Sequence, residues 1–533
     1  MSKITFKDLS PENIEYIKHI YYQEMLHKEK TDILSAKFGI AERTVRDWWG
    51  KLDLVKLKTD LPPQLQKAQD RNLNKNTKVL LVTTAQNKTS INKDFLSNLI
   101  VYKNYITNVL GKEAEIVIIP SRYRNPTNNI EDEKTKSSDW WEDEVSDYLF
   151  YGKVNFGDTL ISCDSHISPT CKNPLDGYEI LAENNHVVLG HTKNHFKTLP
   201  RFRGDALRVM ASTGCVTSKN YSKSKSGESG YMLHSYGFVV VELKEKDVCY
   251  IPRNVKVKSD GSFTDLIYSV VNKEVSKVDS SLGFIWGDIH AEQVNRDFLN
   301  VTKELVAKLN PQKSVLHDIF DGSTVNVHET KDMFLQRLKI TQGKHLLENE
   351  VSECLDLVDE IKGCCGEVWI SESNHDNFLT RHIDNENWKK DLHNSPSYLK
   401  YALISQTVDL RDYGNILGYL IWERFGDSVK YMKMGDSMYI ADYYCSAHGD
   451  YSSNGAKGAT RGFSRLNLKL IHGHSHSPML HNNVTCVGVT ANIHQWYNRK
   501  GLSSWAYAHS VIHNNGKNQL LVFNDDYSLS GLI

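Results

Sequence analysis

Five fragments rich in histidine and carboxylate side chains follow one another along the second half of the chain. In order they are Asp288-Ile289-His290, His317-Asp318-Ile319-Phe320-Asp321-Gly322, Ser373-Asn374-His375-Asp376, Ala447-His448-Gly449-Asp450 and His472-Gly473-His474-Ser475-His476. Carboxylate and amide oxygens, together with imidazole nitrogens, are the ligands that hold manganese, iron or zinc. A single Asp-x-His pair is usually incidental, but this many fragments in succession predict a metal centre.

The order of these fragments resembles the calcineurin-like metallophosphoesterases, whose motifs read D-x-H, G-D-x-x-D, G-N-H-D, H and G-H-x-H. The resemblance covers roughly residues 281–525. Two positions depart from the family pattern, because His317 and Ser373 stand where the family usually has glycine. Both are turn positions, where the change reshapes a loop. Neither removes a ligand, so activity is still expected.

The resemblance implies a role for each matching residue. It assigns a first metal ion to Asp288, His290 and His476, a bridging position to Asp318, and a second ion to Asn374, His448 and His474. His375 would protonate the leaving oxygen or stabilise the transition state, with Asp376 supporting it. Mn²⁺ is the expected metal for this mixed ligand set. Asp321 is expected to shape its loop, and four other histidines have no counterpart among the family's ligands, namely His317, His328, His382 and His472.

Strands must carry these fragments at their carboxyl ends, because that is where α/β folds place their chemistry. Apolar runs predict strands at 281–286, 313–316, 367–370, 437–444 and 469–471, each directly before one fragment. One long helix is expected over 330–361 and another over 455–466, and 378–436 forms a lid or substrate platform. The prediction for residues 281–533 is therefore a two-sheet αββα metallophosphoesterase sandwich, within an α/β protein.

The N-terminal residues 1–56 predict a small all-α domain of three helices. Ser10 caps the first helix ahead of Pro11, Thr31-Asp32 caps a second that ends at residue 38, and Gly39 makes the turn to a third over 41–49. The pattern resembles a helix-turn-helix whose third helix would present four side chains to DNA, those of Arg43, Thr44, Arg46 and Trp49. Because the charges here nearly balance, a helical bundle used for assembly is the alternative.

Residues 57–77 predict a linker, and 78–280 an α/β middle domain without a recognisable catalytic motif. A strand at 78–83, a helix at 94–110 and a strand at 114–119 form a βαβ unit. Further strands are expected at 186–190 and 236–242. The segment 193–225 is basic with interleaved aromatic residues and is predicted to contact DNA phosphates through Arg201, Arg203 and Arg208. A solvated charged loop is the alternative there, and 218–230 is expected to be mobile without a partner.

Composition limits the function classes that remain. The chain has 533 residues, 40% hydrophobic and 24% charged, with a net charge of −1, so polyanion binding must depend on local patches. No apolar run approaches the ~18 residues of a membrane span, and the N-terminus has no signal core. Nine cysteines, an odd number without framework spacing, favour a reducing compartment. A cytoplasmic protein is therefore expected.

Together these features predict a two-metal-dependent nuclease that hydrolyses DNA, similar to the DNA-cleaving, repair-nuclease-like branch of the family. The whole-chain arrangement also resembles the pre-early DNases of T5-type bacteriophages, which would imply degradation of host DNA in the host cytoplasm. DNA is the expected partner, and homo-oligomerisation stays open. The first alternative is a phosphatase or small-molecule phosphodiesterase. The second is a non-enzymatic DNA-binding transfer or packaging protein with a structural metal site.

Overall fold

A computed structural model describes residues 5–23, 25, 27–52, 61–123, 139–327, 329–385, 387–496 and 498–533. The chain divides into two compact units, residues 1–66 and 67–533. The predicted boundary between residues 280 and 281 therefore does not separate two compact units. Of the predicted linker, residues 57–60 lie outside the described residues, and α4 (Pro63–Gln69) occupies the part that follows.

The first unit is formed by α1 (Pro11–Tyr22), α2 (His27–Phe38) and α3 (Glu42–Lys51) around one apolar core. The Ser10 hydroxyl accepts the Asn13 amide at 3.2 Å, so the predicted cap of α1 is present. Gly39 has a φ of +62°, the left-handed conformation that the turn before α3 requires. The second helix begins earlier than expected, because the Thr31 hydroxyl bonds the Lys28 carbonyl inside the helix instead of capping it.

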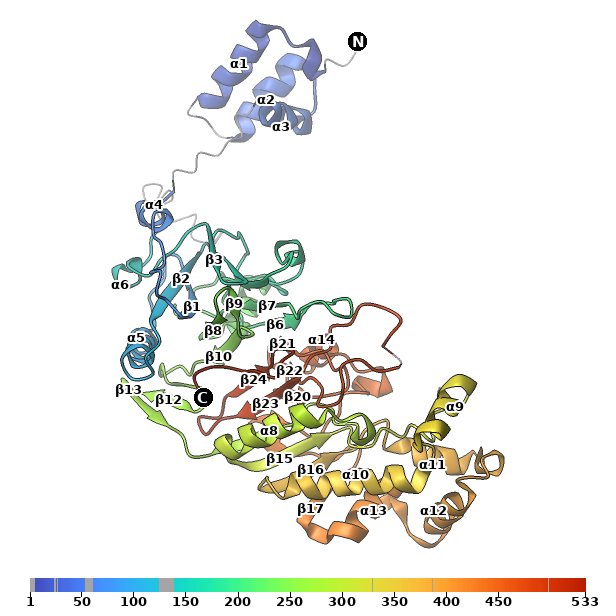
Figure 1. The fold of residues 1–533 in the computed structure, drawn as a ribbon. Helices are drawn as coiled ribbons and strands as arrows, with labels where there is room; N and C mark the ends of the chain where they lie inside the picture. The colour runs from blue at the N-terminus through green and yellow to red at the C-terminus, as the bar shows by residue number, and fades with distance from the viewer. Residues whose placement is uncertain are drawn as a thin grey trace. The chain divides into compact units, whose positions relative to one another are not determined.

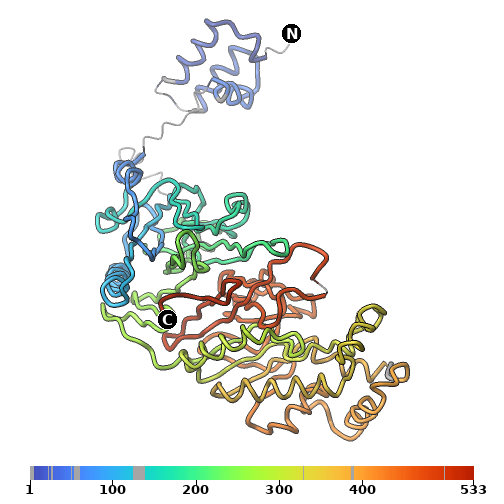
Figure 2. The backbone as a smooth tube through the Cα atoms, in the orientation of Figure 1, coloured from blue at the N-terminus to red at the C-terminus, as the bar shows by residue number. Residues whose placement is uncertain are grey.

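The second unit is organised around one long sheet, ten-stranded in the described part of the chain. Its order is β18 (Tyr439–Ile440), β19 (Tyr443–Tyr444), β20 (Leu470–His472), β22 (Val484–Cys486), β21 (Met479–His481), β6 (Phe196–Thr198), β7 (Val209–Ser212), β5 (His186–Leu189), β4 (Thr159–Ser162) and β3 (Lys153–Phe156). Strands from both predicted domains share this sheet and meet where β21 pairs antiparallel with β6. In Figure 2 this is where the green and red parts of the chain adjoin.

Two further sheets pack against the long sheet. One has the order β17 (Val429–Met432), β16 (Glu367–Ser371), β15 (Pro311–His317), β14 (Ser281–Ile285), β23 (Ala508–Ile512) and β24 (Asn518–Val522). The other has the order β10 (Arg253–Lys256), β8 (Gly237–Glu245), β1 (Val79–Gln86) and β2 (Ala114–Ser121), with β9 (Val248–Cys249) paired to β8. Their side chains form two buried cores with those of the long sheet.

Helices and a small sheet complete the second unit (Figure 1). The helices are α5 (Lys93–Asn108), α6 (Asp143–Ser146), α7 (Lys225–Leu233), α8 (Arg296–Leu309), α9 (Met333–Gln342), α10 (Leu347–Lys362), α11 (Asn377–Asp384), α12 (Ser395–Thr407), α13 (Ile416–Phe425) and α14 (Thr460–Phe463). The small sheet contains β11 (Phe263–Asp265), β12 (Tyr268–Val271) and β13 (Glu274–Lys277). Helix α8 packs onto the sheet of β14 through Phe298, whose ring stacks on His509 of β23.

The two flanking sheets repeat one connection pattern. Strand β14 pairs parallel with β15 and antiparallel with β23, which pairs antiparallel with β24. In the same way, strand β1 pairs parallel with β2 and antiparallel with β8, which pairs antiparallel with β10. The long sheet contains a repeat of its own. Its strands β18, β19, β20, β22 and β21 match β3, β4, β5, β7 and β6 in that order, and each pair of neighbours has the same parallel or antiparallel sense.

The expected α/β fold is present, with local differences. The helix expected over 330–361 is two helices, because Gly343 ends α9 with a left-handed φ of +71° before α10 begins. The strand expected over 437–444 is a hairpin of β18 and β19 that turns at Ala441. Only α14 and a short 3-10 turn form within 455–466. The segment expected to be mobile, 218–230, contains most of α7, capped by the Ser224 hydroxyl.

Candidate metal centre

The predicted ligands lie where parallel strands end. Strands β14, β15 and β16 run parallel, and Asp288, Asp318 and Asn374 follow them in turn. Backbone hydrogen bonds join the first two loops, since the His290 amide donates to the Asp318 carbonyl at 2.8 Å. The loops after β19 and β20 are joined in the same way, since the Gly473 amide donates to the His448 carbonyl. The fold thus brings segments almost 200 residues apart together where strands of two packed sheets end.

Among the described residues, four buried side chains form one group whose ligand atoms all lie within 4.8 Å of one another: Asp288, His290, Asp318 and His476. His476 Nε2 lies 2.9 Å from Asp288 Oδ2 and 3.1 Å from His290 Nε2. His290 Nε2 lies 3.3 Å from Asp318 Oδ2. Two imidazoles and two carboxylates at these distances can hold a metal ion.

Two further predicted ligands, His448 and His474, lie beside Asp318 and Asp288, and the third, Asn374, follows β16. His448 Nε2 lies 3.6 Å from Asp318 Oδ2, the same oxygen that His290 approaches. The His474 ring centroid lies 5.2 Å from that of His448, and the His474 amide donates to Asp288 Oδ2 at 2.7 Å. Asn374 completes the set, with a buried side-chain oxygen. Asp318 therefore lies between two groups of potential ligands.

The backbone of four predicted site residues is held in an uncommon conformation. Positive φ values occur at His290 (47°), Asp318 (50°), His474 (71°) and His476 (56°). Non-glycine residues in this region carry strain and persist only where the surrounding structure fixes them. At Gly473 a Cβ atom would lie 2.0 Å from Asp288 Oδ1, so only glycine allows this close approach. Four strained residues in one cluster are typical of a functional site.

The residues present fit a divalent metal, as their polar atoms show. Among the described residues, buried side-chain atoms that lack a hydrogen-bond partner include Asp288 Oδ1, Asp318 Oδ1, Asn374 Oδ1, His476 Nδ1 and both ring nitrogens of His448. Leaving such atoms buried without partners costs free energy, about 1–3 kcal/mol for each neutral group and more for charged ones. Their gathering in one place is explained if metal ions complete their coordination.

The electrostatics of the metal-free cluster also suit a cation. Burial and the neighbouring Asp318 raise the pKa of Asp288 to about 7. Burial opposes the charging of His290, but Asp318, Asp321 and Asp288 outweigh it and raise its pKa to about 9. Burial lowers the pKa of His448 and of His476 well below the usual value, so both rings are neutral and can act as ligands. A metal ion would take the place of the protons that hold the carboxylates together.

Known proteins offer one informative comparison. No protein-family profile matches the chain. Protein A1 of Escherichia phage T5 is 26% identical to it over 469 residues, which cover 85% of this chain and 83% of that protein. This chain therefore resembles a bacteriophage protein over most of its length. Among solved structures, Vps29 of Chaetomium thermophilum covers 38% of this chain at 10% identity with a TM-score of 0.19, and another crystal structure has a TM-score of 0.25. Both scores are too low to support an argument.

The predicted catalytic pair is only partly as expected. His375 lies beside the cluster, its ring centroid 4.9 Å from that of His290, and its Nδ1 lies 2.7 Å from the Asp321 carbonyl oxygen. Asp376 directs its carboxylate elsewhere, because its Oδ2 accepts the Ser373 amide and the Tyr431 hydroxyl, each at 3.0 Å. Asp376 therefore holds the loop that carries Asn374 instead of supporting the histidine that precedes it.

Asp321 is the residue whose importance the sequence did not reveal. Its Oδ1 lies 3.2 Å from His290 Nδ1, while its carbonyl bonds His375. It thus orients two of the site's histidines, a role that exceeds the loop shaping expected of it. The only signal in the sequence is its place three residues after Asp318, the second aspartate of the G-D-x-x-D pattern.

The remaining histidines differ in their surroundings. His472 donates or accepts at both ring nitrogens, with Thr460 Oγ1 at 3.2 Å and the Gly473 carbonyl at 2.9 Å, which leaves none for a metal. His317 is buried beside His448, with ring centroids 5.7 Å apart. His382 stacks on Tyr398 away from the cluster. His328 lies outside the described residues.

The basic middle segment does not present its arginines together. Arg201 is buried and forms a bidentate ion pair with Asp525, so it does not offer its charge to DNA. Arg208 is half-buried and bonds the Glu183 carbonyl. Arg203 is exposed and lines a pocket with His494, Arg499 and Trp505, which we call the arginine pocket. This pocket adjoins the cluster, since the Trp505 ring lies 4.1 Å from that of His476.

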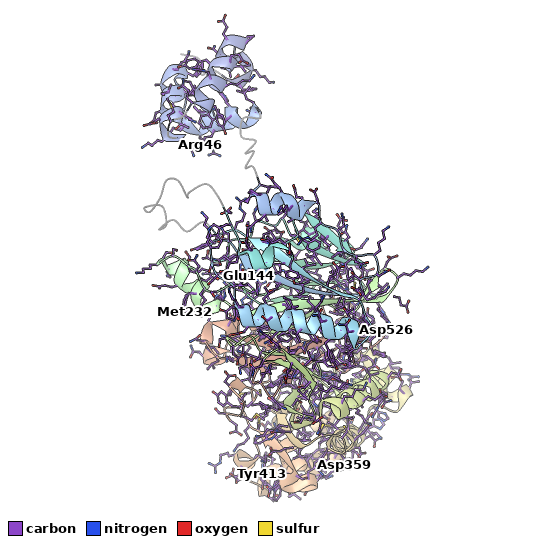
Figure 3. All side chains as sticks on the ribbon, turned by 90° about the vertical axis from the view of Figure 1, so that its left-hand side faces the viewer. Arg46, Glu144, Met232, Asp359, Tyr413 and Asp526 are labelled. Carbon is purple, nitrogen blue, oxygen red and sulfur yellow. The ribbon has the colours of Figure 1, made fainter. Side chains whose placement is uncertain are left out.

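The third helix of the first unit presents some of its predicted residues. Arg43 and Arg46 are exposed, and Arg46 pairs with Glu42 at 3.0 Å (Figure 3 labels Arg46). Thr44 is half-buried. Trp49, expected to face outward, is 1% exposed and packs edge-on against Tyr21. The correction follows from packing, because Tyr21 of α1 covers Trp49 while Phe38 of α2 covers Trp48. No helix in the described part of the chain is long and apolar enough to cross a membrane.

Proposed function

We propose that this chain is a metal-dependent nuclease that hydrolyses phosphodiester bonds of DNA, built on a metallophosphoesterase sandwich in residues 281–533. The observation that carries the proposal is the buried cluster around Asp318, in which the ligand atoms of Asp288, His290, Asp318 and His476 lie within 4.8 Å of one another and the rings of His448 and His474 lie beside them. A structural site that only stabilises a fold is normally closed by four protein ligands. The predicted ligands are more numerous than four and lie in two groups beside Asp318. Such a set suits two metal ions that share the Asp318 carboxylate.

The ligands divide as the family resemblance implies. Asp288, His290 and His476 would hold one ion, Asn374, His448 and His474 a second, and Asp318 both. Two divalent ions, Mn²⁺ by preference for this ligand set, would supply positive charge for the phosphoryl oxygens and lower the pKa of water. Asp321 supports this arrangement because its carboxylate, 3.2 Å from His290 Nδ1, fixes the ring so that Nε2 faces Asp318.

His375 is the proposed general acid. A carbonyl oxygen only accepts hydrogen bonds, so His375 Nδ1 carries a hydrogen and donates it in the hydrogen bond to the Asp321 carbonyl. The other nitrogen, Nε2, is then the atom that exchanges a proton with substrate. Water attacks phosphorus and loses a proton to solvent while the bond from phosphorus to the sugar oxygen breaks, and the imidazolium form of His375, which carries hydrogen on both nitrogens, donates its Nε2 proton to that oxygen. The reaction leaves a phosphate monoester and a hydroxyl at the cut.

Two surfaces support DNA as the substrate. Arg203 and Arg499 are exposed at the arginine pocket beside the cluster, where they would bind neighbouring phosphates. Arg43 and Arg46 are exposed on α3, which would act as a helix-turn-helix recognition helix. The similarity to a phage T5 protein supports a role during infection, with host DNA in the host cytoplasm as the target.

A nuclease assay tests the proposal directly. The purified chain is incubated with Mn²⁺ and either linear or circular duplex DNA, beside p-nitrophenyl phosphate and bis-p-nitrophenyl phosphate. Cleavage of DNA and of the diester, abolished by EDTA and by Asp318→Ala, is expected. Hydrolysis of the monoester alone would replace the nuclease by a phosphatase. Absence of all activity at every metal tested would reduce the cluster to a structural site.

A further inference from the structure

Residues 79–257 repeat the strand connections of the metal-bearing part of the chain, and short sequence matches support the correspondence. Aligning the strand registers of β1 and β14 places Val82 with Ile285, an offset of 203 residues. The same offset aligns Asn92-Lys93-Asp94-Phe95-Leu96 with Asn295-Arg296-Asp297-Phe298-Leu299. Both segments begin a helix, α5 and α8, whose asparagine side chain accepts the amide three residues later. Sequence and pairing thus agree independently.

The long sheet shows the symmetry that relates the two parts. The registers of β5 with β7 and of β20 with β22 align Leu189 with His472. In the next positions Gly190-His191-Thr192-Lys193 corresponds to Gly473-His474-Ser475-His476. At the junction of the two parts, Phe196 of β6 pairs with Leu480 of β21. The registers of β6 with β7 and of β21 with β22 also make these two residues counterparts in the repeat. A local two-fold axis therefore passes through that strand pair.

The repeat keeps His191 in the place of His474 but has lost other residues that would bind metal. Ala85 takes the place of Asp288, Asn87 that of His290, and Pro120 that of Asp318. Lys193 takes the place of His476, and its ammonium donates to the Cys171 carbonyl at 2.6 Å. In the described residues no group of His, Cys, Asp or Glu able to hold an ion lies in this part. A positive side chain thus occupies a position that a metal ligand holds in the other half.

A cavity lined by lysines lies beside this altered site. It measures about 290 Å³ and is lined by Lys193, Lys219, Lys256, Lys469 and Lys517, with no carboxylate among its lining residues. We call it the lysine pocket. Its remaining walls include His234, Tyr236 and the side chains of Asn482 and Asn483. Among the described residues, these lysines form one ion pair, between Lys469 and Asp442, and that acid lies outside the lining.

The lysine pocket is the counterpart of the arginine pocket. Its Lys219 and His234 correspond to Ile493 and Trp505 of the arginine pocket by the registers of β7 with β22 and of β8 with β23. Each pocket is closed by the hairpin of the opposite part, β21–β22 for the lysine pocket and β6–β7 for the arginine pocket. Both entrances carry positive charge, although only one adjoins a metal centre.

We propose that the lysine pocket binds a phosphate group of a DNA strand without metal, as a second anchoring site formed from a repeat of the catalytic fold. The choice of DNA as the source of the phosphate depends on the proposed function, whereas phosphate binding itself does not. The pocket offers several ammonium donors, three asparagines, two tyrosines and a histidine. Proteins that bind single strands use cationic and aromatic groups of this kind for phosphate and base contacts.

Energetics favour an anion in this position. Burial, then Lys517 and Lys469, lower the pKa of Lys256 to about 7. Burial and Lys469 likewise lower the pKa of Lys517. Like charges held together in a partly buried cavity repel, and a bound phosphate would remove that repulsion while supplying hydrogen-bond acceptors. Lys256 Nζ lies 2.6 Å from Asn518 Oδ1, so this lysine is already fixed in place for a ligand.

Binding of a fluorescein-labelled, 5′-phosphorylated single-stranded oligonucleotide in EDTA tests the proposal, because no hydrolysis occurs there. In the triple variant K219Q/K469Q/K517Q we expect at least ~10-fold weaker binding, with a smaller salt slope. The matched control K75Q/K246Q/K308Q removes three exposed lysines outside both pockets and should bind like wild type. The arginine version K219R/K469R/K517R keeps the charges and should restore affinity.

Two further arms identify the source of the phosphate and guard against misfolding. Melting temperatures of the variants should match wild type, and Mn²⁺-dependent hydrolysis of bis-p-nitrophenyl phosphate should be unchanged. If a deoxynucleoside monophosphate or inorganic phosphate binds through the lysines but the oligonucleotide does not, the DNA assignment is overturned. Equal oligonucleotide affinity for wild type, triple variant and control would overturn the pocket as a phosphate site. An inactive chain that still binds through the lysines would separate this inference from the proposed function.

Discussion

The Nδ1 atom of His375 lies 2.7 Å from the backbone carbonyl oxygen of Asp321. This bond fixes the tautomer, because the carbonyl can only accept. Asp321 also holds His290 through its carboxylate, so one residue orients both a proposed acid and a proposed ligand. Positioning of this kind, within fractions of an ångström, is what proton transfer and metal binding require.

Replacing Asp318 by alanine is expected to abolish metal-dependent hydrolysis. The carboxylate lies within 3.3 Å of His290 and 3.6 Å of His448, so its loss leaves the two groups of ligands without a shared anion. Turnover and bound metal, measured by elemental analysis, should fall together. The control Asp409→Ala alters an exposed aspartate paired only with Arg411 and should change neither. Wild-type turnover with full metal in the Asp318 variant would show that the site is misassigned.

His375→Ala should slow cleavage about 10²–10⁴-fold, the usual contribution of a general acid, while metal content and DNA affinity stay the same. The ring is adjacent to the cluster but is not among the seven assigned ligands. Single-turnover rates across pH provide the readout, since the limb that reports the acid should disappear. His166→Ala, at an exposed histidine outside the site, serves as control. Loss of metal from the His375 variant would instead make this residue a ligand.

Arg203 and Arg499 are expected to capture DNA phosphates, whereas Arg201 is not. The double variant R203A/R499A should weaken duplex binding and reduce the salt slope by about 0.9 for each phosphate that the protein no longer neutralises. Bis-p-nitrophenyl phosphate should still be hydrolysed. The control R411A/R465A removes two exposed arginines that do not line the arginine pocket. An unchanged salt slope in the R203A/R499A protein would exclude this surface.

Removal of residues 1–66 should leave hydrolysis of a small phosphodiester intact. The first unit contains none of the proposed ligands and has its own apolar core. The rate of cleavage of long DNA should fall by the amount that Arg43 and Arg46 contribute to DNA capture. The variant R43A/R46A in the full chain should show the same loss of rate. If the truncated protein cleaves long DNA like the full chain, the three helices are better regarded as an assembly module.

Stability should fall as the solution is made acidic, partly through His509. Burial lowers the pKa of this ring to about 3, whereas an unfolded histidine titrates near 6.5. The unfolded chain therefore binds a proton first, and stability is lost progressively from pH 6.5 toward 3, by up to ~1.4 kcal/mol per pH unit. His509→Asn should flatten this dependence in melting temperatures of the metal-free protein, and exposed His166→Asn should not. Parallel pH curves for wild type and His509→Asn would contradict this account.

The sequence by itself determined the identity and order of the site residues. Short apolar runs before Asp288, Asp318 and Asn374 were enough to predict parallel strands whose ends meet, since alternation and strand length are local properties. It also predicted the cap at Ser10 and the turn at Gly39, which depend on neighbours within a few positions. At these positions the structure agrees with the local pattern.

Only the tertiary structure decided the properties that depend on distant contacts. The ion pair of Arg201 with Asp525, 324 residues away, and the burial of Trp49 remove two residues from the DNA surface that helical or charge patterns alone would include. The same holds for Asp321 and for the repeat in residues 79–257, whose matches in sequence to the second half of the chain are a few residues long. Side-chain direction and pairing register are set by the packing of whole sheets, and a sequence read one segment at a time does not contain them.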